Sequence, residues 1–72
     1  MNLVSAKTNV NLRVSKIKVD TKSEVRLKSL GIIIGSSIIV LCITGAGVVL
    51  ALGQNVIALS KGIACKIMVE YD

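Results

Sequence analysis

The side chains that most often carry out chemistry in proteins are few in this sequence, and they form no recognisable group. The 72 residues include four acidic residues, two cysteines and no histidine. Without histidine the commonest general base is absent, and no two carboxylates have a spacing that indicates acid–base catalysis. The cysteines and carboxylates also lack the short, regular spacing of zinc or iron ligands. The sequence therefore predicts a protein that is not an enzyme, with no metal site and no cofactor.

The two cysteines, Cys42 and Cys65, each lie in an apolar stretch. We interpret both as buried thiols, because a free cysteine behaves as a small apolar residue. The alternative is a disulfide or a reactive thiol. A covalent link would help a chain of this length, since it buries only about 60% of the surface that it exposes when unfolded.

Basic side chains are the remaining candidates for a functional site. The net charge is +5, and seven of the nine basic residues lie within residues 1–28, whereas residues 29–60 carry no charge. Six of the seven form the candidate binding set: Arg13, Lys16, Lys18, Lys22, Arg26 and Lys28. The simplest interpretation is a solvated face that keeps an apolar domain in solution. The functional interpretation is an electropositive patch for an acidic surface of a partner protein or for the inner leaflet of a membrane.

Nucleic acid is not an expected partner of this basic set. Proteins that bind nucleic acid usually combine basic patches with stacking aromatic residues or with a helix that enters a groove. Tyr71 is the only aromatic residue of the chain. An SH3-like nucleic-acid-binding module is therefore an alternative that rests on the charge alone.

The uncharged residues 30–53 allow two different folds. They are numerous enough to cross about 30 Å of hydrocarbon as one helix, and the basic residues before them fit the positive-inside rule. A single-pass membrane protein with residues 30–53 as its transmembrane helix is thus an alternative. We favour paired strands, because β-branched residues suit a pleated strand and glycine disfavours a helix. The glycines expected at turns are Gly31, Gly35, Gly45, Gly47 and Gly53.

The apolar pattern predicts five or six short strands and one short helix. Residues 9–19 alternate between apolar and polar, with a change of phase near Ser15 and Lys16 that a β-bulge would produce. Residues 21–24 have the spacing of a capping box, and Gly31 stands where a helix of about ten residues would end. The later strands are expected at residues 36–44, 48–52, 56–59 and 65–70, with one helical turn at 60–64.

These elements predict a mainly β protein, a small SH3-like barrel with its helix between the first and second core strands. Closing the strands into a barrel removes exposed strand edges. Residues 1–8 are polar and mixed, and we expect them to be a loose tail. Residues 32–59 hold more apolar side chains than one small barrel can enclose. Such an excess indicates either a partner site or self-association into a homo-oligomer.

Residues 26–38, RLKSLGIIIGSSI, resemble the FeoA family. The family pattern is a leucine, two residues, Leu-Gly, an aliphatic residue, two residues and a second glycine, and it is matched here by Leu27, Leu30, Gly31 and Gly35. The last hairpin, turn and closing strand, and the order of the first strand, bulge and helix, are also similar to the family. The resemblance covers about residues 8–70. One departure is Ile34, at a position where the family often has proline.

The resemblance implies a single SH3-like domain over residues 1–72 that acts in the cytoplasm beside a membrane ferrous iron permease. Family members are thought to bind this permease, which carries a GTPase domain, and to modulate transport without catalysis. The implied partner is therefore the cytoplasmic GTPase domain, and the protein would be peripheral to the inner membrane through that partner alone. A similar barrel forms the C-terminal domain of iron- and manganese-dependent repressors. We expect this chain instead to be a free-standing barrel domain.

Overall fold

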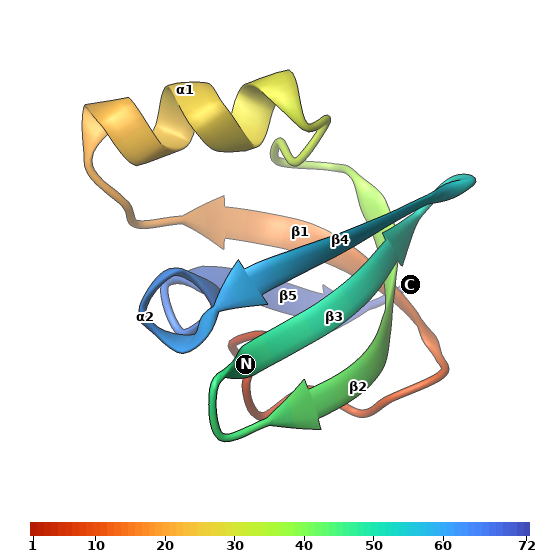
Figure 1. The fold of residues 1–72 in the computed structure, drawn as a ribbon. Coiled ribbons are helices and arrows are strands. Elements are labelled where there is room, and N and C mark those ends of the chain that lie inside the picture. Colours follow the sequence, from red (N-terminus) through yellow and green to blue (C-terminus); the bar gives the residue numbers. More distant parts are fainter.

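A computed structural model describes residues 1–72 and shows five antiparallel strands in one curled sheet, with a helix lying across one end (Figure 1). The elements are β1 (Asn11–Ile17), α1 (Thr21–Ser29), β2 (Ser37–Thr44), β3 (Gly47–Leu52), β4 (Asn55–Ser60), α2 (Lys61–Ala64) and β5 (Ile67–Tyr71). The strand order is β4-β3-β2-β1-β5. The mainly β class and the helix between the first two strands are as predicted.

The core is formed by alternate residues of four strands, as the period of a half-buried strand requires. Its strand members are Leu12, Val14, Ile38, Val40, Val48, Leu50, Ile67 and Val69. The remaining strand, β4, contributes no fully buried side chain. One face of the sheet therefore encloses the core, and β4 lies at the margin of the core.

A bulge in β1 is confirmed where the phase of the sequence changes. The register with β5 shifts between Val14 and Lys16. A second bulge, between Val40 and Cys42 of β2, was not expected. Since one extra residue reverses the direction of every side chain after it, this bulge changes which residues of β2 face the core.

The prediction of buried thiols is wrong for both cysteines. Cys42 is exposed because the bulge before it turns it away from the core, and Ile43 packs against the core instead. Cys65 is exposed because β5 begins only at Ile67, so that Cys65 caps α2 and lies outside the strand. Both thiols are free.

Helix α1 begins and ends through different local contacts. The carboxylate of Asp20 accepts a hydrogen bond from the backbone N–H of Ser23 at 3.0 Å, so the N-cap lies one residue before the Thr21 of the expected capping box. Gly31 follows the helix with a φ of 89°, a left-handed conformation that glycine adopts without strain, and this end was predicted correctly.

Residues 30–53 do not form a membrane-spanning helix. They comprise Leu30, which caps α1, a loop and the β2–β3 hairpin, in which Thr44 pairs with Gly47. The transmembrane alternative is therefore wrong for this segment. None of the helices is long and apolar enough to cross a lipid bilayer.

The expected loose tail is instead part of the fold. Leu3 is fully buried, and its N–H donates to the carbonyl of Ile67 at 3.1 Å. The N–H of Val69 donates to the carbonyl of Met1 at 2.7 Å. Residues 1–3 thus run beside β5 and cover its outer edge, a long-range contact that the polar composition of the segment does not indicate.

Replacing Leu3 tests whether the N-terminal segment belongs to the core. Leu3→Ala should lower the free energy of unfolding by about 2–5 kcal/mol, since it leaves a cavity in a small core. Urea unfolding followed by circular dichroism measures the change. Lys7→Ala, at an exposed position of the same segment, should have almost no effect. Equal stabilities of the Leu3 variant and the wild type would support a loose tail.

A second pair of substitutions tests the close approach of β3 and β4. A Cβ on Gly47 would overlap the carbonyl oxygen of Leu59, whereas a Cβ on Gly45 would meet open space. We expect Gly47→Ala to lower the free energy of unfolding by about 1–3 kcal/mol through overpacking, and Gly45→Ala to leave it almost unchanged. Thermal unfolding measures the stability of both variants. Equal melting temperatures of Gly47→Ala and Gly45→Ala would contradict this packing.

Candidate protein-binding site

A groove lies between α1 and β4 and is open to the solvent. Its lining comprises Ser23, Arg26 and Leu27 of α1 with its C-cap Leu30, Ala58, Leu59 and Ser60 of β4, and Ile63 of α2. The cavity measures about 180 Å³. Since small-molecule sites usually measure roughly 300–1,000 Å³, this groove fits one or two side chains and not a drug-sized ligand.

The helix presents a single face to the groove. The lining residues of α1 have the i, i+3, i+4, i+7 spacing of one helical face. Leu27 is buried and fixes the helix to the core, and it is the only fully buried residue of α1. Leu30 at the end of the same face is 39% exposed. The inner face of α1 is therefore only partly covered by the barrel.

The opposite wall is the free edge of β4. A two-residue turn joins Leu52 to Asn55, so Asn55, Ile57 and Leu59 exchange hydrogen bonds with β3. The residues between them, Val56 and Ala58, direct their N–H and C=O groups away from β3. No other strand pairs with β4, and no hydrogen bond from a turn or loop reaches these groups. The expectation that the barrel leaves no exposed edge is therefore wrong for β4.

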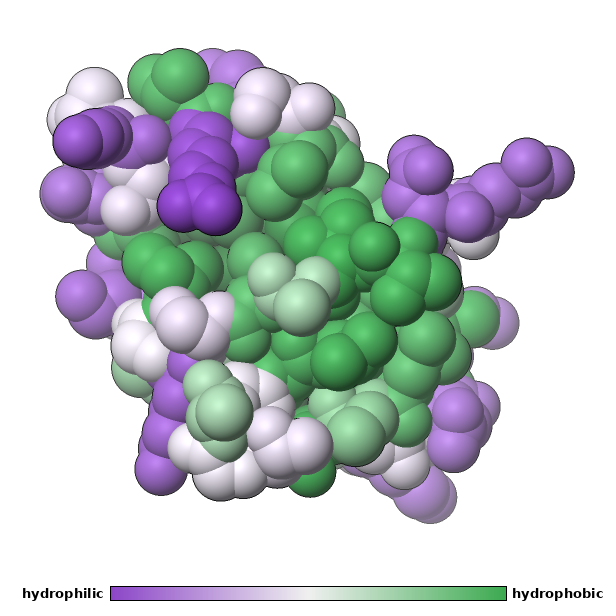
Figure 2. All heavy atoms as spheres, in the orientation of Figure 1, coloured by the Kyte–Doolittle hydropathy of each residue, from purple (hydrophilic) through white to green (hydrophobic).

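The surface around the groove is apolar. Figure 2 shows a continuous hydrophobic face over β3 and β4 that reaches α1, with polar groups at its rim. Val56 is 67% exposed, and Ile57 and Leu59 are half-buried. A continuous exposed patch of this kind usually marks a contact site with another molecule.

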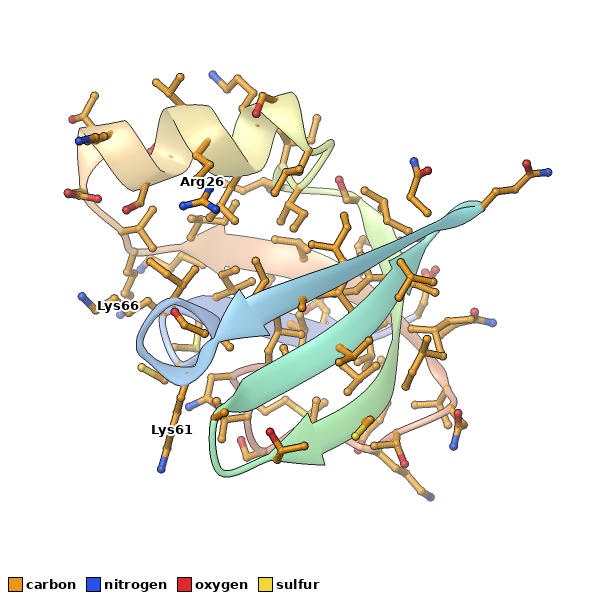
Figure 3. All side chains as sticks on the ribbon, viewed as in Figure 1. Arg26, Lys61 and Lys66 are labelled. Carbon is orange, nitrogen blue, oxygen red and sulfur yellow. The ribbon has the colours of Figure 1, made fainter.

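Arg26 is the only charged residue in the groove lining. Its side chain is exposed and points from α1 toward the side of the barrel that holds α2, where Lys61 and Lys66 also lie (Figure 3). The single ion pair of the structure joins Arg13 to Asp72. The guanidinium of Arg26 thus has no carboxylate partner within the chain and is free to bind one.

The six basic residues predicted as a binding set do not share one face. Arg26 lies at the groove, whereas Lys28 lines a second hollow on the other side of α1, together with Glu24. Arg13 lies on β1 beside Asp72, and this ion pair, with its hydrogen bond, holds the pKa of the Asp72 carboxyl below its usual value.

The other members of the set, Lys16, Lys18 and Lys22, are exposed and line none of the hollows.

Two lysines outside the predicted set, Lys61 and Lys66, lie on the side of the barrel that holds α2, and neither lines the groove (Figure 3). The N–H of Lys18 donates to the carbonyl of Lys66 at 2.9 Å, so the pairing of β1 with β5 brings these distant residues together. Lys61 begins α2, directly after β4. Only their position beside the predicted turn at residues 60–64 could have indicated them.

The groove has no chemical group arranged for catalysis. Its polar lining consists of two serines and one arginine. No three histidine, cysteine, aspartate or glutamate side chains lie together anywhere in the structure. What this arrangement can do is bind: it offers unpaired backbone groups, an apolar surface and a free guanidinium.

Comparisons with known proteins give a consistent family. A family model described as the FeoA domain matches residues 1–71. The structure is similar to iron(II) transport protein A from Clostridium thermocellum, with 26% identity and a TM-score of 0.89. That match covers 99% of this chain and 45% of that protein, so this chain spans less than half of its length. None of the curated proteins matches the chain.

Two further solved structures have the same fold. A crystal structure of an iron uptake regulatory protein, FeoA, has 26% identity and a TM-score of 0.85, and the match covers 96% of this chain and 93% of that one. A manganese-dependent transcriptional repressor has 20% identity and a TM-score of 0.89, over 99% of this chain and 41% of that protein. The SH3-like fold expected from the sequence is confirmed.

Removing the N-cap should loosen the helix that forms one wall of the groove. Hydrogen bonds from Ser23, together with the nearby charge of Lys66, hold the pKa of Asp20 below its usual value. A lowered folded-state pKa means that ionised Asp20 contributes stability fully above its unfolded pKa, roughly 3.9, and loses it as the pH falls through the folded value.

The melting temperature of Asp20→Ala should therefore lie below that of the wild type at pH 7, and the gap should narrow below about pH 4. Asp20→Asn, which can still cap a helix, should keep most of the stability at pH 7. A gap between the alanine variant and the wild type that is constant from pH 7 to pH 2 would contradict this role of the carboxylate.

Proposed function

Because the chain belongs to the FeoA domain family, we propose that it is a non-enzymatic accessory protein of ferrous iron uptake that binds the cytoplasmic GTPase domain of an iron permease. The observation that carries the proposal is the family match over residues 1–71. The names of the two relatives that are 26% identical, an iron(II) transport protein and an iron uptake regulatory protein, agree with it. In this proposal the protein works in the cytoplasm and reaches the inner membrane only through its partner.

The groove supports a role in protein contact. Its volume of about 180 Å³ suits side chains of another protein, and its lining combines apolar groups with one unpaired cation. FeoA domains are accessory domains and not a known family of enzymes, so contact is the means by which such a domain would act. A larger assembly surface is available from the apolar face over β3 and β4 (Figure 2).

Modulation of transport places a requirement on the binding. A ligand can shift an equilibrium between two conformations only if it binds one of them more tightly. A protein that modulates a GTPase by docking must therefore distinguish the nucleotide states of that GTPase. We propose that the affinity of this chain differs between the GDP-bound domain and the domain bound to a non-hydrolysable GTP analogue.

The basic residues of α1 provide the test of this proposed function. Reversing Lys22, Arg26 and Lys28 to glutamate should weaken binding to the purified GTPase domain by roughly tenfold or more, since it places a negative charge at Arg26 in the groove and makes the exposed surface of α1 acidic. Isothermal titration calorimetry measures the affinity, and the difference should shrink at high salt.

Lys7→Glu serves as the control, because the N-terminal segment lies on the opposite side of the barrel from α1 (Figure 1). This variant should bind like the wild type. An unchanged affinity of the triple variant would discard the role of α1, and no binding of the wild type in either nucleotide state would discard the function.

A further inference from the structure

We propose that the groove between α1 and β4 receives an extended segment of the partner, which pairs with the free edge of β4 and brings a carboxylate to Arg26. The identity of the partner rests on the function proposed above. The features that specify the occupant are the unpaired backbone of β4, the size and lining of the groove, and its charge.

The two edges of the sheet are treated differently. Residues 1–3 of the chain itself run beside β5 and form hydrogen bonds with Ile67 and Val69. The edge of β4 has no such cover, although Val56 and Ala58 direct donors and acceptors outward from it. The fold thus protects one edge with an extended segment of its own chain and leaves the other edge open to a segment of another chain.

The open edge also lacks the usual protection against pairing. Natural edge strands often carry a lysine, a proline or a bulge that prevents another strand from adding to them. β4 (Asn55–Ser60) contains no charged residue and no proline, and its register with β3 is continuous. Six residues in this state form a good template for β-augmentation, in which a peptide adds as a further strand.

The groove limits what can pair with this edge. Its second wall is α1, and its volume of about 180 Å³ admits side chains from a single extended segment. Successive side chains of a strand point to opposite faces, so alternate residues of the segment would enter the groove. Because Leu27, Leu30 and Ile63 line it, those residues should be apolar.

Charge decides between a partner protein and a second copy of this chain. The guanidinium of Arg26 has no acidic partner within the chain, and a carboxylate can accept two parallel hydrogen bonds from it. A second copy that paired through its own β4 would bring no acidic residue, since residues 55–60 contain none, and would place a second Arg26 nearby. The occupant is therefore a segment with an acidic residue beside apolar ones.

The second hollow next to α1 does not compete for such a segment. It is larger, at about 350 Å³, and is lined by Ile17, Glu24, Lys28 and residues 32–34. Only the last residue of β1, Ile17, belongs to its lining, and Ile17 already pairs with Ile67 of β5, so the hollow offers no length of free strand edge. Its lining carries one acidic and one basic residue, so it has no preference for a charge of one sign.

Hydrogen exchange by NMR tests the pairing directly. The full isotope-labelled chain is mixed with the purified GTPase domain in the nucleotide state that binds better. The amides of Val56 and Ala58 should exchange quickly in the free chain and at least about tenfold more slowly in the complex, because each new hydrogen bond protects its donor. The amides of Ile57 and Leu59, already bonded to β3, should be slow in both.

Two variants complement the exchange measurement. Ala58→Pro removes the outward N–H without removing a bond to β3, and it should weaken binding roughly two- to tenfold. Arg26→Lys keeps the charge but loses the paired donors of the guanidinium, so it should bind more weakly than the wild type and more tightly than Arg26→Glu. If Ala58→Pro does not fold, the exchange rates of the wild-type chain decide alone.

Each outcome has a distinct meaning. A complex in which Val56 and Ala58 still exchange quickly would overturn the strand pairing and leave the proposed function intact. No binding of the GTPase domain would overturn both. Protection of these amides in the free chain, increasing with its concentration, would identify a second copy as the occupant and would also overturn the inference.

Discussion

A strand at the edge of a sheet leaves a row of backbone N–H and C=O groups unpaired, and the fold of this chain follows from how it limits such edges. β1 lies between β2 and β5, and the bulge after Val14 lets it curve to pair with both. The edge of β5 is covered by residues 1–3. β4 is the edge strand that no other segment of the chain covers, and it is also the strand with no fully buried side chain. The unmet pairing and the exposed apolar surface therefore occur in the same place.

The position of α1 turns this open edge into a site. The helix is fixed to the core by Leu27 alone, so it stands over β4 without filling the space between them. Arg26 precedes Leu27 and is therefore held at the rim of that space. Arg13 shows what happens to the same side chain elsewhere: beside Asp72 it is neutralised within the chain. A free guanidinium, an apolar wall and unpaired backbone groups favour recognition of a peptide segment.

Local patterns were sufficient to predict much of the fold. The alternation in residues 9–19 gave β1 and its bulge, and Gly31 marked the end of α1, because these features depend on neighbouring residues. Long-range features were missed. Leu3 is buried and bonds to Ile67 at the far end of the sequence, and Cys42 is exposed by a bulge that no turn residue signals. The basic set was divided because Arg26 and Lys28 point about 200° apart on a helix.

The central claim is that the sheet gains a sixth strand when the protein meets its partner. The crystal structure of this chain in complex with the GTPase domain of an iron permease tests it most directly. We predict an extended segment of the GTPase domain between β4 and α1, with its backbone bonded to Val56 and Ala58 and a carboxylate on Arg26. A complex in which the edge of β4 faces solvent, with the contact made elsewhere, would contradict the account.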